Sequence, residues 1–428
     1  MAKISLFCKE KIDKNVKKSL NYLLKKKNII EISILPDVYQ KEHTKIPSGI
    51  TVVTKEVLLP EMLYGIGCGI SVFTFKINEP IIKSKIIKIM NIICNSIKNR
   101  QSIENSFRSI KIKNPILDFG EFIKSLDIIN ISELWRNDIV SNMRFNLLKK
   151  EVFDEYINWP EKDIGNAIIE GNHFIELQII KEVYDKDYLN ILGLSKGDIL
   201  LMIHLEDEGL NTKIEKKFLD KYNRNEIKYN SKEGDELISL TNISQRYCFL
   251  NRIIIANTIF KSLKDKGIKL EQVSFILDTT HSGIFKNQTK DGVEIYHTSG
   301  TTLALPPRNE NLSGIIREKG QPLILPGALG MESYILKTSM GTNKSSLTVN
   351  HGLGRKISKE YARSNFKEEE VTKTFKYPEF IVKKVSNWDL VSQMNICYKD
   401  INKVLGIMEK NDLVSKVAKL RPLGTIKG

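Results

Sequence analysis

The feature that most constrains the fold is the alternation of short β-branched runs with glycine-rich turns, around one long stretch of helical composition. Residues 30–35 and 70–75 are rich in Ile, Val and aromatic residues, and a turn with three glycines lies at 65–69. Such runs predict strands. From about 81 to 161, Lys, Asn, Ile and Leu recur at helical spacing. The pattern predicts an α+β fold in which a helical lobe is inserted between two β-rich halves.

The rest of the chain continues this pattern. Residues 240–267 have apolar positions at helical spacing, and the chain after Tyr361 is predicted to be helical and basic. The tail 420–428 carries Leu, Pro and Ile between its charges, so we expect it to pack as part of the fold. Pro36-Asp37 is predicted to end the first strand. Further strands are predicted at residues 51–53, 172–180, 199–204, 275–277 and 293–296, with two more within 322–338.

Composition describes a large globular protein with a basic excess. The 428 residues are 41% hydrophobic and 27% charged, which excludes wholesale disorder. Length alone allows two or three domains or one large domain. Lys and Arg number 66 against 51 Asp and Glu, a net charge of +15. Such an excess suggests an anionic partner such as nucleic acid or a phosphate-rich substrate. A genome rich in A and T, which favours Lys, Asn and Ile codons, explains it equally well.

The cysteines and the N-terminus point to the cytoplasm. The five cysteines form no CxxC pair, which excludes a disulfide scaffold and a zinc ribbon and fits a reducing compartment. The N-terminus has no long apolar region, and no uncharged apolar run is long enough to span a bilayer, so we expect no membrane association. The cysteines are Cys8, Cys68, Cys94, Cys248 and Cys397.

Histidine is the sparse residue that suggests a site. Five of the six histidines follow a predicted strand or lie in a glycine-flanked turn, where a β-framework delivers side chains into a shared pocket. Together with Cys68, which lies among glycines, they could form a metal cluster. Each could also be a structural residue, and Cys68 a small buried hydrophobic residue. The five are His173, His204, His281, His297 and His351; the sixth is His43.

These residues also form an ordered pattern. The chain resembles the RtcB family of RNA ligases, which join a 3'-phosphate or 2',3'-cyclic phosphate end to a 5'-hydroxyl end. Each matching segment is weak alone, but their joint order over most of the chain is specific. The segments are 34–38 (ILPDV), 65–69 (GIGCG), 171–176 (GNHFIE), 203–204 (IH), 251–252 (NR), 278–281 (DTTH), 297–301 (HTSGT), 320–334 (from GQP to SY), 351–355 (HGLGR) and 421–428 (RPLGTIKG).

The resemblance implies a fold, a mechanism and a set of site residues. The fold is one domain, 1–428, with β-sheets and packed helices around a central metal cleft. GTP and one or two manganese ions would be used, and His351 would attack the α-phosphate of GTP to form a histidine-GMP intermediate. The partners implied are RNA with 3'-phosphate and 5'-hydroxyl ends and a small activator protein. Gly352 and Gly354 would leave room for the nucleotide. The implied metal ligands are Cys68, His173, His204 and His281, and the implied nucleotide contacts are Asn172, Glu176, Ser333, His351 and Lys427.

The chain departs from the family pattern close to the proposed metal. Gly65 stands where the family has a metal-binding Asp, and Tyr39 stands where it has a His. The loops after His204 and His297 lose cations, and the first gains acids. The site is therefore predicted to be more negative than in the family, with the basic excess elsewhere.

Two accounts of these departures stay open. In the first, Glu206 or Asp207 supplies the missing oxygen ligand and ligation is retained. In the second, the protein does another job. It would then be a divergent guanylyltransferase with another acceptor, or a non-catalytic RNA-binding relic of the family. The loop 206–208 would then be a solvated acidic turn.

Overall fold

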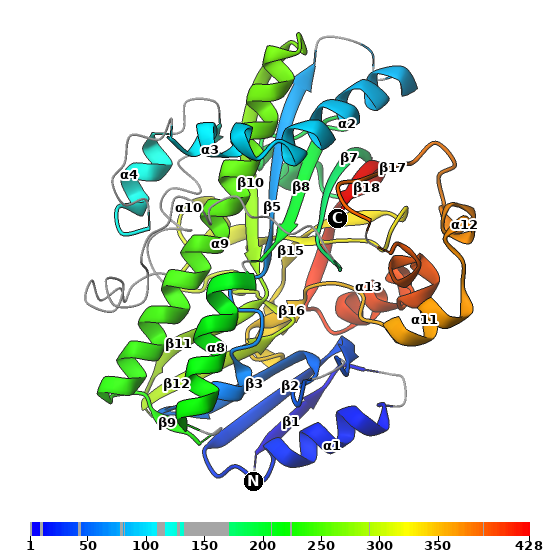
Figure 1. Cartoon of the computed structure of the whole chain (residues 1–428). Helices are drawn as coiled ribbons and strands as arrows, with labels where there is room; N and C mark the ends of the chain where they lie inside the picture. Colours follow the sequence, from blue (N-terminus) through cyan, green and yellow to red (C-terminus); the bar gives the residue numbers. More distant parts are fainter. Residues whose placement is uncertain are drawn as a thin grey trace.

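Helix α9 (Lys232–Asp265) runs through the middle of the protein in the computed structural model (Figure 1). It begins at Ser231, whose side chain accepts a hydrogen bond from the Gly234 backbone N–H, as an N-cap residue should. Residues 239–260 are buried without interruption, because the helix packs against strands β5, β8 and β10 on one side and helix α2 on another. The helix therefore lies in the core, and the polar residues that it carries there, such as Arg252, need partners.

The structure describes most of the chain. The described residues are 2–8, 12–41, 44–77, 80, 82–108, 116–125, 129–131, 171–206, 208–222, 225–290, 292–387 and 389–428.

The larger sheet carries the residues of the site. In the described part of the chain it has nine strands, almost all antiparallel, with β6 parallel to β10 and β17 parallel to β18. The C-terminal strand β18 lies between β15 and β7, so the end of the chain is in the interior of the sheet (Figure 1). In sheet order the strands are β14 (Pro322–Leu325), β15 (Ser333–Thr338), β18 (Val414–Lys427), β7 (Phe174–Val183), β8 (Ile199–Leu205), β5 (Gly69–Ile77), β10 (Leu270–Thr280) and β6 (Asn130–Ile131), with β17 (Ile381–Lys384) beside β18.

A smaller sheet holds the N-terminal end, with helix α1 (Lys14–Leu23) packed beside β2 (Figure 1). Its strands in order are β1 (Lys3–Leu6), β2 (Ile29–Tyr39), β3 (Ser48–Lys55), β12 (Gly292–Ser299) and β11 (Ser282–Thr289). Two short pairs complete the strands: β13 (Thr301–Leu303) with β16 (Thr348–Asn350), and β4 (Val57–Leu58) with β9 (Ile227–Lys228).

The other described helices cover the sheets. They are α2 (Lys83–Lys98), α3 (Arg100–Arg108), α4 (Phe119–Lys124), α7 (Lys186–Ile191), α8 (Glu208–Tyr222), α10 (Gly314–Lys319), α11 (Lys359–Asn365), α12 (Glu368–Val371) and α13 (Ile401–Lys410). Short 3-10 turns lie at Pro60–Met62, Met340–Lys344, Thr372–Thr374, Val391–Gln393 and Asn395–Cys397. Within the described residues, no helix combines the length and apolar character that crossing a bilayer requires.

A buried ion pair joins α9 to the strands that carry the site. The Arg252 guanidinium is fully buried and donates to both carboxylate oxygens of Asp278 on β10, at 3.0 and 3.2 Å. It also donates to the backbone oxygens of Gly67 and Leu205, each at 3.1 Å. One side chain therefore fixes the turn before Cys68, the end of β8 and the end of β10.

The α+β class predicted from the sequence is confirmed, and so are the predicted strands. Two details of the prediction were wrong. Strand β2 continues through Pro36-Asp37 to Tyr39 instead of ending there. The chain after Tyr361 is helical only in part, because its last residues form strand β18.

The predicted tail packing is confirmed, since most of β18 is buried. In the range predicted as a helical lobe, helices α2, α3 and α4 are present together with the short strand β6. Residues 132–161 lie outside the described residues. That lobe and the single domain 1–428 stay predictions.

The Arg252 ion pair gives the first testable prediction. Arg252→Met should lower the free energy of unfolding by about 3–5 kcal/mol, because it leaves the Asp278 carboxylate buried without its charged partner. Urea unfolding measures it. The double variant Arg252→Met/Asp278→Leu should be less destabilised than Arg252→Met. Lys261→Met removes an exposed cation from the same helix and should change stability by less than about 0.5 kcal/mol. Equal stability of Arg252→Met and Lys261→Met would contradict the assignment.

His297 shows how one predicted histidine became part of the core. It is fully buried on β12; its Nε2 accepts from the Leu59 backbone N–H at 3.1 Å, and its Nδ1 donates to the Val52 oxygen at 3.3 Å. Burial lowers the pKa of His297 to about 4. Between pH 4 and about pH 6.5, the His297 side chain is protonated in the unfolded chain but neutral in the folded chain. The contribution of His297 to stability is therefore complete above about pH 6.5 and is lost as the pH falls toward 4.

We therefore expect His297 to make unfolding pH-dependent. From pH 7 to pH 5 it should lower the free energy of unfolding by about 2 kcal/mol. His297→Gln can keep both hydrogen bonds without titrating, so its stability should depend less on pH by that amount. Denaturant unfolding at the two pH values measures the difference. Parallel pH profiles for the two proteins would rule out the shifted pKa.

Candidate functional site

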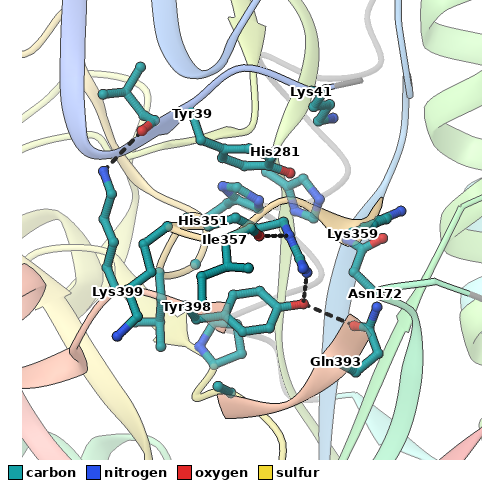
Figure 2. Close-up of a pocket in the computed structure, with 18 of the residues that line it drawn as sticks. Tyr39, Lys41, Asn172, His281, His351, Ile357, Lys359, Gln393, Tyr398 and Lys399 are labelled. Carbon is teal, nitrogen blue, oxygen red and sulfur yellow. Dashed lines mark hydrogen bonds between the residues drawn. The ribbon is translucent and has the colours of Figure 1, made fainter. Parts of the chain in front are cut away.

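A cavity of about 790 Å³ lies where the two sheets meet. Segments far apart in the sequence line it: the end of β2, the turn at 64–68, the start of β7, the end of β8, the segment 351–359 and Lys427 at the end of β18. Cavities of this size accept ligands as large as a nucleotide. The lining residues around Tyr39, His281 and His351 are shown in Figure 2.

Four of the residues predicted to bind metal meet at one place. The Cys68 Sγ lies 3.3 Å from His204 Nε2 and 3.7 Å from His173 Nε2. Donor atoms that share one ion at about 2.0–2.3 Å lie about 3–4 Å apart, so these three atoms are spaced as ligands. The ring of His281 follows, with its centroid 5.1 Å from that of His204.

The register of the larger sheet explains this convergence. His204 on β8 lies opposite Ile70 of β5 and opposite Phe174 of β7, so Cys68 and His173 precede its two partner positions. The His281 backbone N–H donates to the Cys68 oxygen at 2.9 Å. The Asn172 backbone oxygen lies 3.2 Å from His204 Nδ1, which leaves Nε2 free to face the thiol.

The chemistry of these side chains fits a cation. Burial lowers the pKa values of His204 and His281 well below normal, so both rings are neutral, the form that coordinates metal. Burial also raises the pKa of the Cys68 thiol, and a nearby cation would favour the thiolate. The His281 Nδ1 is buried and has no hydrogen-bond partner among the described residues. Cys68, His173, His204 and His281 are thus the residues able to hold a metal.

His351 is held by a carboxylate that the sequence analysis did not single out. Its Nδ1 lies 2.9 Å from an oxygen of Asp37, which is fully buried on β2. The His351 and His281 rings are neighbours, with centroids 4.6 Å apart (Figure 2). Because Asp37 engages Nδ1, Nε2 is the nitrogen available for chemistry. The segment 34–38, which resembles a family motif, contains Asp37 and could have identified it. From the sequence, however, the strand is predicted to end at Pro36-Asp37, whereas β2 continues to Tyr39.

The two glycines after His351 have different roles. A side chain at Gly352 would meet no atom within 4 Å, which agrees with room for a ligand there. A side chain at Gly354 would collide with the Asp37 backbone at 2.0 Å, and the residue has φ +68°. The expectation that Gly354 makes room for a nucleotide was therefore wrong, because it lets the 351–355 turn approach β2.

Three of the residues predicted to contact a nucleotide also line the cavity. Asn172, Glu176 and Lys427 line the cavity. Burial raises the pKa of the Glu176 carboxyl to about 7 and lowers that of the Lys427 ammonium to about 7. Ser333 is connected to Glu176 through Gln178. The Ser333 hydroxyl accepts a hydrogen bond from Gln178 Nε2 at 2.8 Å, and the same amide group also donates to Glu176. Direct contact between Ser333 and a nucleotide stays a prediction.

Cations outnumber acids among the residues that line the cavity. The described lining has three acids and six cations, a net charge of +3 out of +15 for the whole chain. Whether the site is more negative than in the family stays a prediction. Lys399 donates to the oxygens of Pro36 and Val38, and Lys41 and Lys359 also line the cavity (Figure 2). The acids are Asp13, Glu176 and Glu206, and the cations are Lys41, Arg355, Lys356, Lys359, Lys399 and Lys427.

The other residues singled out have clear positions. Tyr39 lines the cavity, and burial raises its pKa to about 12, so it stays a neutral phenol. His297 lies in the core, away from the cluster. His43 and Asp207 lie outside the described residues.

Known proteins resemble this chain over most of its length. A family model described as tRNA-splicing ligase RtcB matches residues 24–428. The tRNA-splicing ligase RtcB of Nanoarchaeum equitans is 26% identical over 386 residues, which cover 85% of this chain and 81% of that protein.

Two further relatives are larger. The tRNA-splicing ligase RtcB of Methanocaldococcus jannaschii is 25% identical, covering 94% of this chain and 43% of its own length. The RNA-splicing ligase RtcB homolog 1 of Entamoeba histolytica is 29% identical, covering 60% of this chain and 53% of its own length. The chain thus spans less than two thirds of either protein. The family model nevertheless extends over nearly the whole chain, and this protein belongs to the RtcB family.

Proposed function

We propose that this protein is an RNA ligase that joins a 3'-phosphate or 2',3'-cyclic phosphate end to a 5'-hydroxyl end, using GTP and manganese. The names of its relatives support a ligase acting on RNA. The observation that carries the proposal is the contact between His351 Nδ1 and the buried Asp37 carboxylate at 2.9 Å. The His281 ring lies between His351 and the cluster of Cys68, His173 and His204. An imidazole oriented in this way is an activated nucleophile.

In the first step, His351 Nε2 attacks the α-phosphorus of GTP. A nitrogen–phosphorus bond forms, the bond to the bridging oxygen breaks, and pyrophosphate leaves. Asp37 holds the Nδ1 proton and stabilises the positive charge that develops on the ring. The open space beside Gly352 admits the nucleotide.

In the later steps GMP passes to RNA. A 2',3'-cyclic phosphate end is first opened by water, which forms a new phosphorus–oxygen bond while the bond to the 2'-oxygen breaks, and a 3'-phosphate results. An oxygen of the RNA 3'-phosphate then attacks the phosphorus of histidine-GMP, and the nitrogen–phosphorus bond breaks. The RNA 5'-hydroxyl then attacks the activated 3'-phosphate, a phosphodiester forms, and GMP leaves. The cations around the cavity attract the anionic RNA and nucleotide. Manganese held by Cys68, His173, His204 and His281 would supply positive charge beside the phosphates.

Glu176 is the residue proposed to select guanine. A carboxylate can accept hydrogen bonds from the N1–H and the amino group of guanine, whereas adenine offers no such pair of donors. Its hydrogen bond from Gln178 fixes the carboxylate in orientation. Lys427, at the end of β18, donates to the Gly171 oxygen at 3.2 Å and so keeps the tail docked there.

Covalent guanylylation tests the nucleophile. Intact-protein mass after incubation with GTP and manganese should rise by one GMP in the wild-type protein and not at all in His351→Ala. Asp37→Asn should form the adduct about 100-fold more slowly, because the amide cannot stabilise the charged ring. Its GTP affinity should stay near wild type, which separates positioning from loss of the fold.

RNA ends distinguish the proposed ligase from the alternatives. Wild-type protein should join an RNA 3'-phosphate to a 5'-hydroxyl, which a denaturing gel detects. An adduct without ligation would favour a guanylyltransferase with another acceptor. Absence of any adduct in folded, manganese-loaded protein would refute both catalytic proposals and favour the RNA-binding relic.

The shifted pKa of Glu176 predicts pH-dependent GTP binding. Since burial raises that pKa to about 7, the carboxylate that accepts from guanine is lost as the pH falls through 7. GTP affinity should fall up to about tenfold per pH unit between pH 7 and 5. Glu176→Gln should remove this dependence and most of the preference for GTP over ATP. Lys427 titrates in the same range but favours anion binding at lower pH, so the comparison of wild type with Glu176→Gln isolates Glu176. Calorimetry without metal measures the GTP affinity of the wild-type protein and of Glu176→Gln at each pH. Identical pH profiles for the two proteins would contradict the proposal that Glu176 recognises guanine.

A further inference from the structure

The turn before Cys68 has a gap beside the metal ligands, and an acid from another strand reaches it. Gly65 has φ +70°, and a Cβ built on it would lie 3.2 Å from the Glu206 Oε2 and 3.9 Å from the Ser282 hydroxyl. The Glu206 carboxylate therefore contacts the space that a side chain at position 65 would enter.

Strand β8 brings Glu206 to this place. Its last residue, Leu205, pairs with Gly69, so the chain reaches the Cys68 turn as β8 ends. Glu206 follows directly, two residues after the cluster residue His204. Its side chain is 23% exposed and lines the cavity.

The two oxygens of Glu206 face two different neighbours. Oε2 points toward Gly65, while Oε1 lies 3.9 Å from His173 Nε2. That separation is too long for a hydrogen bond. It is a normal spacing for two ligands of one ion, because donors at about 2.0–2.2 Å from a metal can lie up to about 4.3 Å apart.

The donor atoms lie in a row around the thiol. The His204 ring is 5.1 Å from both the His173 ring and the His281 ring, and His281 is next to His351. Glu206 extends the row beyond His173. Its carboxylate oxygen adds the hard ligand that manganese prefers, which the thiol and imidazoles lack.

We propose that Glu206 is a metal ligand that replaces the side chain missing at Gly65 and, with His173 and Cys68, holds a divalent cation. This inference rests on the proposed function for the identity of the ion, manganese. It assigns the acid in this loop a role next to the catalytic cluster rather than in a solvated turn.

Manganese binding without GTP or RNA tests the proposal. Equilibrium dialysis and calorimetry on wild-type protein should give two ions per chain. Glu206→Ala should bind one ion, with affinity for the other reduced about 100-fold. Glu310→Ala removes an exposed acid from a loop elsewhere and should bind both ions as wild type does. Thermal unfolding of the metal-free proteins should show that both variants are folded.

A restoring variant tests the position. Gly65→Asp in the Glu206→Ala background should regain most of the lost affinity, because Asp tolerates the left-handed conformation and the space beside it is then free. No gain would overturn the placement at Gly65. Unchanged stoichiometry and affinity in Glu206→Ala would overturn the ligand role itself, as would failure of the wild-type protein to bind a second ion.

The two proposals fail in different measurements. A protein that binds manganese through Glu206 but forms no GMP adduct would contradict the ligase and leave the ligand standing. A wild-type protein that forms the GMP adduct, together with a Glu206→Ala variant that still binds two ions, would contradict the ligand role of Glu206 and leave the ligase proposal standing.

Discussion

The site depends on the buried ion pair between Arg252 and Asp278. Arg252 comes from the middle of α9, where burial on all sides leaves no water to solvate a guanidinium. Among the described residues its charge is balanced by Asp278, and it also donates to the oxygens of Gly67 and Leu205. These contacts lie next to Cys68 and His204, and Asp278 is three residues before His281. A charge that must be paired in the core thereby helps to fix the positions of the residues proposed to bind metal.

A second constraint comes from the end of the chain. Strand β18 enters the interior of the larger sheet, and its last paired residue is Lys427. The lining of the cavity beside Glu176 therefore includes a residue from the last strand of the sheet. Asp37 shows a similar dependence, because Gly354 must pack on its backbone before His351 can reach its carboxylate. The nucleophile and its surroundings thus depend on contacts between opposite ends of the chain.

The sequence predicted most of the cluster, because strand ends and glycine turns are visible locally. It did so for Cys68, His204 and His281, which neighbouring strands bring together. It did not single out Asp37, since a proline was taken as the end of a strand that in fact continues through a bulge. His297 has the same local context as the ligands but faces the core, and only the pairing of β3 and β12 decides this. Local sequence patterns identify which residues end a strand or lie in a turn. The direction in which their side chains point depends on the register of strand pairing, which local patterns do not give.

The same limit applies to the charge of the site. The altered loops after His204 and His297 are visible in the sequence, but cations from the segment 351–359, Lys41 and Lys399 are brought to the cavity only by the fold. Glu206 lies beside His173 and the Cys68 thiol, where it would offer negative charge to a bound cation. Lys41, Lys359 and Lys399 line the same cavity and would attract phosphates. In the proposed arrangement, the acid at Glu206 therefore compensates for the side chain missing at Gly65.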